Sequence, residues 1–161
     1  MNPDPDIESR EERDAEDHMR RALALAREAL DRDEAPVGAV VVKDGVVLGE
    51  GFDLRQSLHD PAAHAEILAL RAAAERLGTW NLSGAEMFVT LEPCPMCAGA
   101  ILMARLSRVV WGADSPKWGA VVSNLQMFDA ACFPHRTRYA SGLLKQECAE
   151  LLSRYFQKKR R

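Results

Sequence analysis

Residues 89–100 read Val-Thr-Leu-Glu-Pro-Cys-Pro-Met-Cys-Ala-Gly-Ala, an apolar run followed by two cysteines three positions apart, Cys94 and Cys97. Residues at positions i and i+3 of a helix lie on nearly the same face, so a helix beginning here would bring the two thiols together. The positive end of a helix lowers the pKa of a thiol toward the thiolate that binds metal. Pro93 and Pro95 cost little at such a start, because first-turn amides have no intrahelical partner. The stretch predicts a two-thiolate clamp.

A second cluster, His64-Ala65-Glu66, opens the preceding predicted helix. With His64 as third ligand, the two cysteines form a Cys₂His set, which suits tetrahedral zinc. Three protein ligands leave the fourth position to a water molecule, whose pKa zinc lowers to about 7. Glu66 can then take the proton of that water and return it to a substrate, as general base and then general acid. The two clusters together predict hydrolysis at a catalytic zinc.

This interpretation sets a condition on the backbone. Two residues along a regular helix point about 200° apart, so His64 and Glu66 would face nearly opposite ways. His64 must therefore lie at the edge of the helix, with non-helical dihedral angles.

Three other interpretations of these residues stay open. The cysteine pair is also typical of buried or redox-active thiols, and a histidine and a glutamate at this spacing are also typical of a helix cap and a solvated helix face. A closed structural zinc would need a fourth ligand, for which Cys132 and Cys148 are the candidates. The remaining histidines, His18, His59 and His135, are more typical of surface or packing positions.

Hydrophobic periodicity and turn signals predict an α/β fold around the two clusters. Residues 37–43 and 46–52 are apolar runs that flank Asp44-Gly45, a strong hairpin signal. The order strand, helix, strand then occurs twice between residues 46 and 112, which predicts right-handed crossovers. Beyond the hairpin we expect helices at 18–30, 62–77, 94–105 and 143–158, strands at 87–91 and 109–112, and an irregular segment at 114–137. The pattern indicates a three-layer α/β/α fold with a central mixed sheet of about five strands.

The charge is unevenly distributed along the 161 residues, whose net charge is −3. Residues 1–17 hold eight of the 24 acidic side chains and two of the 21 basic ones, so residues 18–161 carry a balance of +3. We expect 1–17 to be a disordered acidic tail and 18–161 to form one catalytic domain. Neither a membrane span nor a signal peptide is indicated, which predicts a soluble cytoplasmic protein.

The H-x-E and P-C-x-x-C motifs are the signature of zinc nucleobase deaminases. The chain resembles the cytidine deaminase superfamily, and most closely the TadA-type tRNA-specific adenosine deaminases, from about Met19 to Arg161 and through residues 36–40, 59–66 and 89–100. The resemblance implies a homodimer with one zinc ion per subunit. It also implies that the enzyme converts adenosine to inosine at the wobble position of an arginine tRNA anticodon loop, which two subunits read together.

By this resemblance, His64, Cys94 and Cys97 hold zinc and Glu66 transfers protons. Val37 forms an apolar wall for the base, and the backbone amides beside Ala65 and Cys94 contact the attacking oxygen. Ala65 and Pro93 are included among the substrate-binding residues. The remaining substrate contacts are Asp53, after the second strand, His135, and Phe156 in the last helix. An aromatic residue next to Arg154 and Lys158 suits a splayed single-stranded loop, although core packing is the other interpretation of Phe156.

Three residues depart from the pattern of the family. Asp53 and Pro134 each replace an asparagine, and Trp118 replaces a small residue. An ionised aspartate only accepts hydrogen bonds, and it places negative charge near the phosphates of a bound strand. An alternative function is therefore a free-base or nucleoside deaminase, acting on guanine, adenine or a related ring. A third hypothesis is a non-catalytic, zinc-stabilised partner subunit, against which Glu66 argues.

Overall fold

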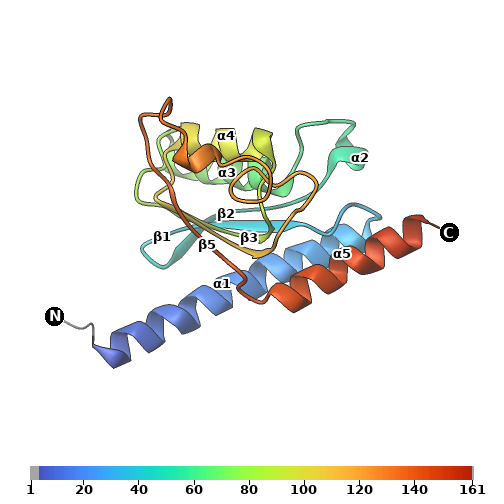
Figure 1. Ribbon diagram of the computed structural model, residues 1–161, viewed down its shortest axis with the longest axis horizontal. Coiled ribbons are helices and arrows are strands. Elements are labelled where there is room, and N and C mark those ends of the chain that lie inside the picture. The colour runs from blue at the N-terminus through green and yellow to red at the C-terminus, as the bar shows by residue number, and fades with distance from the viewer. Residues whose placement is uncertain (1–3, 161) are drawn as a thin grey trace.

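The computed structural model describes residues 4–160 and has three layers, with a sheet covered by two long helices on one face and two on the other (Figure 1). The elements are α1 (Pro5–Asp31), β1 (Gly38–Lys43), β2 (Val46–Phe52), α2 (Arg55–Leu58), α3 (Ala65–Leu77), β3 (Glu86–Leu91), α4 (Pro95–Ala104), β4 (Arg108–Ala113), η1 (Met127–Asp129), β5 (Arg138–Ser141) and α5 (Lys145–Lys159). The predicted three-layer α/β/α fold is confirmed. In the part of the chain described, no helix is both long and apolar enough to cross a membrane.

The sheet is mixed and has five strands in the order β2-β1-β3-β4-β5. β1 pairs antiparallel with β2 and β3, whereas β3, β4 and β5 are mutually parallel. The hairpin between β1 and β2 turns at Asp44 and Gly45, both of which have positive φ. A turn with two positive φ angles matches the twist of the flanking strands, as the Asp-Gly signal predicts.

Each face of the sheet supports a separate core. On β1, Ala39 and Val41 belong to the core beneath α3 and α4, whereas Val40 and Val42 belong to the core beneath α1 and α5. Successive side chains of a strand point to opposite faces, so a strand covered on both sides is apolar throughout.

The beginning of α1 differs from the sequence-based expectation. The helix starts at Pro5, so the prediction of a disordered tail was wrong for residues 5–17, while residues 1–3 lie outside the described part. The Asp4 side chain accepts a hydrogen bond from the Asp6 amide, and Glu16 pairs with Arg20 one turn further along. Capping groups and i,i+4 pairs stabilise a helix without burial, which a criterion based on hydrophobicity does not register.

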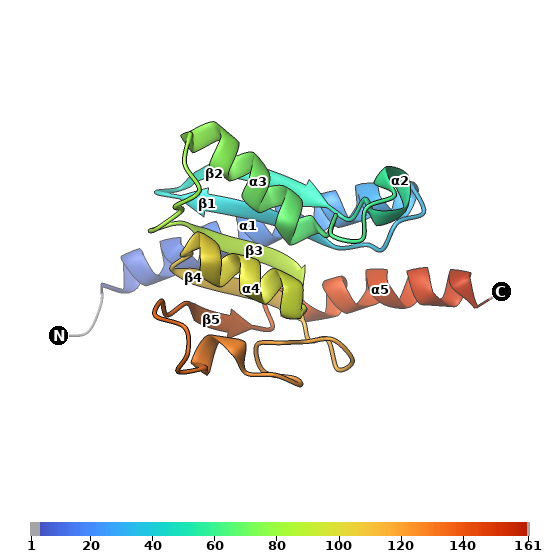
Figure 2. The same cartoon turned by 90° about the horizontal axis from the view of Figure 1, so that it is seen from above.

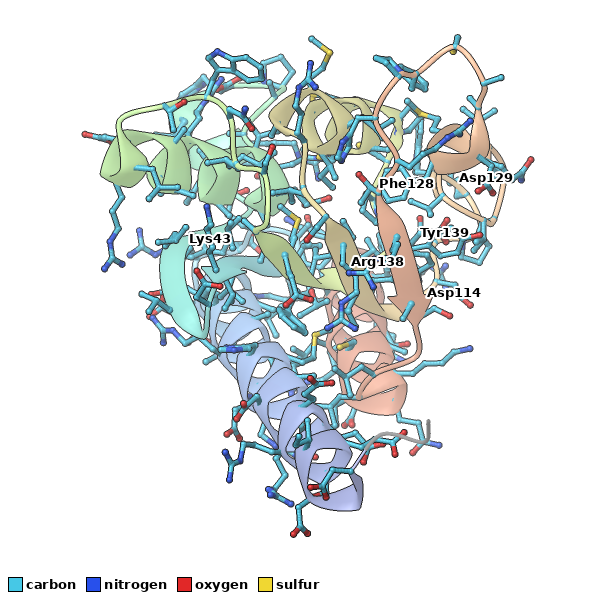
Figure 3. The ribbon with its side chains drawn as sticks, turned by 90° about the vertical axis from the view of Figure 1, so that its left-hand side faces the viewer. Lys43, Asp114, Phe128, Asp129, Arg138 and Tyr139 are labelled. Atoms are coloured by element: carbon cyan, nitrogen blue, oxygen red, sulfur yellow. The ribbon has the colours of Figure 1, made fainter. Side chains whose placement is uncertain are left out.

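The fifth strand, β5, lies within no predicted element. All four of its residues are exposed and it pairs only with β4 at the edge of the sheet, so its sequence lacks the apolar alternation that marks a strand. Its Tyr139 stacks on Trp111 of β4, with ring centroids 5.8 Å apart, and lies 6.2 Å from the Phe128 ring (Figure 3). The preceding segment is irregular apart from η1, as predicted.

Helix α3 lies unusually close to β2, because two glycines face it. A Cβ atom on Gly49 would lie 2.3 Å from the Ala69 carbonyl oxygen, and one on Gly51 would lie 2.5 Å from the Ala65 carbonyl oxygen. Real Cβ atoms do not approach backbone so closely, so the sheet determines where α3 begins.

We therefore expect Gly51→Ala to push α3 off the sheet and to lower the free energy of unfolding by about 2 kcal/mol or more. Gly99→Ala is the matched control, since its new Cβ would have only Met127 Cε nearby, at 3.8 Å, and alanine is favoured over glycine in a helix by about 1 kcal/mol. Urea unfolding measures both. Equal stability of the two variants would contradict the close contact.

Candidate active site

Helices α3 and α4 begin at the same end of the sheet, and α5, on the opposite face, extends toward that end (Figure 2). His64 is the N-cap of α3, with φ −74° and ψ 155°, and Cys94 is the N-cap of α4, with φ −74° and ψ 174°. His64 thus has the extended, non-helical dihedral angles that the sequence analysis requires, so it and Glu66 need not face opposite ways.

The three predicted ligands form a cluster with the dimensions of a zinc site. Their ligand atoms lie within 4.8 Å of one another, and His64 Nδ1 is 3.6 Å from Cys94 Sγ and 3.5 Å from Cys97 Sγ. A tetrahedral zinc with bond lengths of about 2.0 Å to nitrogen and 2.3 Å to sulfur keeps those two ligand atoms about 3.6 Å apart. The donor set and its spacing therefore fit zinc.

The ligands are electrostatically coupled. Hydrogen bonding from the Cys97 thiol, together with that from His64, lowers the pKa of Cys94 to about 4. The same bond to Cys94 raises the pKa of Cys97, and the Cys94 partner also raises the pKa of His64. Without a metal, the group thus holds one thiolate, at Cys94, which is the form of cysteine that binds a cation.

Glu66 is buried beside this cluster, with 3% of its surface exposed. Its Oε1 has no hydrogen-bond partner among residues 4–160. Burial, reinforced by the charge of Cys94, raises the pKa of Glu66 to about 7. A buried carboxylate oxygen without a partner is costly, and its presence next to metal ligands is typical of a catalytic group.

The backbone brings Val37 and Asp53 to the same region. The Asp53 amide donates to the Val37 carbonyl oxygen at 3.2 Å, and the Leu54 amide donates to the carbonyl oxygen of Ala63, the residue before His64, at 3.0 Å. Val37, Asp53 and His64 are therefore tied together by main-chain bonds, although they are distant in sequence.

The Asp53 carboxylate is already paired. Its Oδ1 accepts from the Arg55 amide at 3.0 Å, and its Oδ2 accepts from Arg55 Nε at 3.0 Å. The side chain of Asp53 is almost fully buried, while that of Arg55 is half exposed. The negative charge that distinguishes this position is thus neutralised within the chain.

The other predicted contacts are distributed unequally. Ala65 is buried as the first residue of α3, and Pro93 directly precedes the N-cap of α4, so both border the cluster. Phe156 is 53% exposed on the C-terminal half of α5, which extends toward the end of the sheet where the site lies (Figure 2). Core packing is therefore the wrong interpretation of Phe156.

The structure does not bring His135 to the predicted metal ligands. Its Nε2 lies 2.7 Å from the Leu106 carbonyl oxygen, beyond the C-terminal end of α4, whereas Cys94 and Cys97 lie at the other end of that helix. The spacing between the motifs could not reveal this, because the irregular segment before His135 has no periodicity from which to place it.

Sequence reasoning missed two buried carboxylates, Glu34 and Glu92. Glu34 accepts bonds from the Gln56 and Ser57 amides and so anchors α2. Burial opposes the ionisation of Glu92, but hydrogen bonds led by that of Ser123 outweigh it and lower the pKa of Glu92 below its ordinary value. The only available signal for Glu92 was a charged residue inside an apolar motif, whereas Glu34 follows a run of other charged residues and offered no such signal.

Comparison with known proteins places this geometry in a family. Residues 12–113 match the family model described as the cytidine and deoxycytidylate deaminase zinc-binding region, which includes all three ligands and Glu66. A tRNA-specific adenosine deaminase of Haemophilus influenzae is 47% identical over 88% of this chain and 83% of its own length. The chain belongs to the family of tRNA-specific adenosine deaminases.

Comparison with solved structures supports this family assignment. One described as a tRNA:A34 deaminase, in a study of A-to-I editing at the wobble position of transfer RNA, is 47% identical with a TM-score of 0.82, covering 84% of this chain and 98% of its own. A guanine deaminase from Nitrosomonas europaea is 28% identical with a TM-score of 0.76, covering 87% and 83%. The tRNA deaminase is the more similar of the two by both measures.

The raised pKa of Glu66 predicts how the metal-free deaminase responds to pH. Because the folded-state pKa of about 7 exceeds the ordinary value of 4.5, the carboxyl reduces stability as the pH rises from 4.5 through 7. Glu66→Gln removes this carboxyl, so its stability relative to the wild type should increase with pH. The difference in free energy of unfolding between variant and wild type should be about 3 kcal/mol larger at pH 8 than at pH 4. Urea unfolding in the presence of a chelator measures this. A pH-independent difference would show that the carboxyl is not destabilised by burial.

Proposed function

We propose that this chain is a zinc-dependent hydrolytic deaminase that converts adenosine to inosine at the wobble position of an arginine tRNA anticodon. The observation that carries the proposal is the partnerless, buried Glu66 oxygen beside a zinc-sized group of His64, Cys94 and Cys97. The 47% identity to a tRNA-specific adenosine deaminase, over most of both chains, supports the choice of substrate.

The metal is held by His64 Nδ1 and by the sulfur atoms of Cys94 and Cys97, with one zinc ion per subunit. When bound, zinc acts as a Lewis acid that activates a water molecule at neutral pH. Both thiols lie near the positive N-terminal end of α4, which stabilises their negative charge.

Glu66 moves the protons of the reaction. Its carboxylate accepts a proton from the attacking water and donates it to the purine ring, and a second transfer allows the amino group to leave as ammonia. Water and adenosine thereby give inosine and ammonia, with no net change in Glu66. The burial of Glu66 favours this role, because it raises the pKa of the carboxyl above its ordinary value and so makes it a stronger base.

Asp53 is compatible with an RNA substrate. Its carboxylate accepts hydrogen bonds from the amide and the guanidinium group of Arg55, so it presents little free charge to a phosphate. The same bonds orient the carboxylate toward Arg55, while the higher identity to a tRNA-specific adenosine deaminase favours RNA over a free base. Phe156 supplies an exposed ring on which a base of the anticodon loop can stack. The enzyme is proposed to act in the cytoplasm.

The enzyme is proposed to act as a homodimer through the outer face of α3 and α4. A groove of about 520 Å³ between these helices is lined almost entirely by apolar side chains: Ile67, Leu70, Arg71, Ala74, Trp80, Leu82, Ala100, Met103 and Ala104. Met103 is 72% exposed, which a self-complementary apolar interface would explain. Pro134 and His135 border an adjoining hollow that also includes Trp80 and Met103, so they face the proposed partner.

The direct test compares an arginine anticodon stem-loop with a panel of free bases and nucleosides, each incubated with the purified zinc protein. We expect ammonia release and inosine only with the stem-loop. Turnover of guanine, with no inosine in the RNA, would contradict the proposed substrate.

Two variants separate the roles within the site. Glu66→Gln should retain one zinc per subunit and lose at least about a hundredfold in kcat, because only proton transfer is removed. Cys97→Ser should lose both zinc and activity, because a thiolate ligand is removed. Metal analysis and single-turnover kinetics provide the two readouts. Full activity of Glu66→Gln would exclude the proton-transfer role and leave a non-catalytic subunit as the better hypothesis.

The dimer is tested by a charge placed in the groove. Met103→Asp should shift the protein from dimer to monomer in light scattering at micromolar concentration, since burying an unpaired carboxylate is strongly unfavourable. Leu125→Asp, at a half-exposed position outside the groove, is the control and should remain dimeric. A dimeric Met103→Asp protein would rule out this face.

A further inference from the structure

The loop that follows β4 is bound to the residues directly before Cys94. Oε2 of Glu92 accepts from the Val121, Val122 and Ser123 amides at 3.0–3.2 Å, and its Oε1 accepts from the Ser115 amide. These bonds hold both ends of residues 115–123 on a single buried carboxylate.

A second anchor lies next to Glu92. The Ala120 amide donates to the Pro93 carbonyl oxygen at 2.9 Å, and Pro93 precedes the metal ligand Cys94. Gly119 touches the Glu92 carboxylate so closely that a Cβ atom there would lie 2.4 Å from Glu92 Cδ. The loop is therefore fixed directly against the start of the metal-binding helix.

Trp118 lies at the outer turn of this anchored loop. The turn is closed by bonds from the Gly119 amide to the Ser115 carbonyl oxygen, at 2.8 Å, and from the Trp118 amide to Ser115 Oγ, at 3.3 Å. The indole nevertheless remains 64% exposed, and none of the aromatic ring pairs found in residues 4–160 includes it. The anchored backbone thus presents a large apolar ring to solvent. Trp118 is only two residues from Ala120, whose amide is bonded to Pro93.

The exposed ring has the properties of a stacking surface. Trp loses little conformational entropy on binding, and bases stack on aromatic side chains whatever their identity. Lys117, which is also exposed, precedes it and supplies positive charge for a phosphate. Helix α5, which carries the exposed Phe156, extends toward the end of the sheet where the site lies, so a second exposed aromatic ring is carried by an element directed to that end (Figure 2).

We propose that Trp118 stacks on the base of a nucleotide flanking the target adenosine, and so makes the enzyme favour a single-stranded RNA loop over a free nucleoside. This inference rests on the proposed function. Trp118 is a substrate-binding residue, distinct from the residues that perform the chemistry.

The experiment uses anticodon stem-loops with 2-aminopurine at the nucleotide before or after the wobble position. Stacking on the indole should quench the probe at one of these positions in the wild type. Trp118→Ala should abolish that quenching and raise KM about tenfold, with kcat unchanged. Trp118→Phe should restore most of both effects. Leu125→Ala is the matched control and should behave as the wild type, because Leu125 is an exposed apolar residue of the same loop whose backbone bond to Gly119 the change leaves intact.

The outcomes are separable. If the wild type forms inosine but Trp118→Ala retains both quenching and KM, the stacking role is wrong and the proposed function stands. If Trp118→Phe behaves like Trp118→Ala, the ring does not act by stacking and the inference is also overturned. If the wild type forms no inosine in any stem-loop, the proposed function fails, and binding of the probe RNAs still decides whether Trp118 stacks. Circular dichroism verifies that each variant is folded.

Discussion

His64 and Cys94 each occupy the last non-helical position before a helix, and the geometry of the site depends on this shared placement. An N-cap side chain does not follow the rotation of the helix, so a ligand and a catalytic residue two positions apart can both reach one point. Each helix also directs its positive end toward that point, where thiolate and carboxylate charge gathers. What holds α3 in place is the contact of its backbone with Gly49 and Gly51 of β2. The sheet, rather than the ligands themselves, fixes the position of the site.

The site brings together acidic groups, and the charge on one of them opposes the ionisation of the others. Burial raises the pKa of Glu66 and the bond to Cys94 raises that of Cys97, while the charge on Cys94 adds to both shifts. A positive charge would relieve this competition, and a divalent cation between the sulfur and nitrogen atoms would provide it. The features that reduce the stability of the metal-free chain are therefore those that favour zinc and prepare Glu66 for proton transfer.

Several elements could be predicted from the sequence because their determinants are local. The Asp44-Gly45 turn, the apolar runs of β1 and β3 and the spacing of Cys94 and Cys97 all depend on neighbouring residues. What could not be predicted depends on tertiary partners. β5 is exposed and is a strand only because β4 lies beside it, and His135 is placed by a carbonyl group of Leu106. Glu92 gains its role from amides more than 20 residues away, which no local pattern encodes.

The long α1 separates charge in space as well as in sequence. Its acidic first half extends beyond one end of the sheet, while the C-terminal part of α5 extends toward the opposite end, where α3 and α4 begin (Figures 1 and 2). Lys158 and Lys159 there share Asp33 as partner, and Arg154 and Arg160 add further positive charge. The molecule is thus an electric dipole whose axis runs roughly along its longest dimension. A polyanion approaching from a distance meets repulsion at one end and attraction at the other, so it is turned toward the site before any contact forms. The slightly negative net charge conceals this orienting field, which salt would weaken over a Debye length of about 10 Å at 0.1 M.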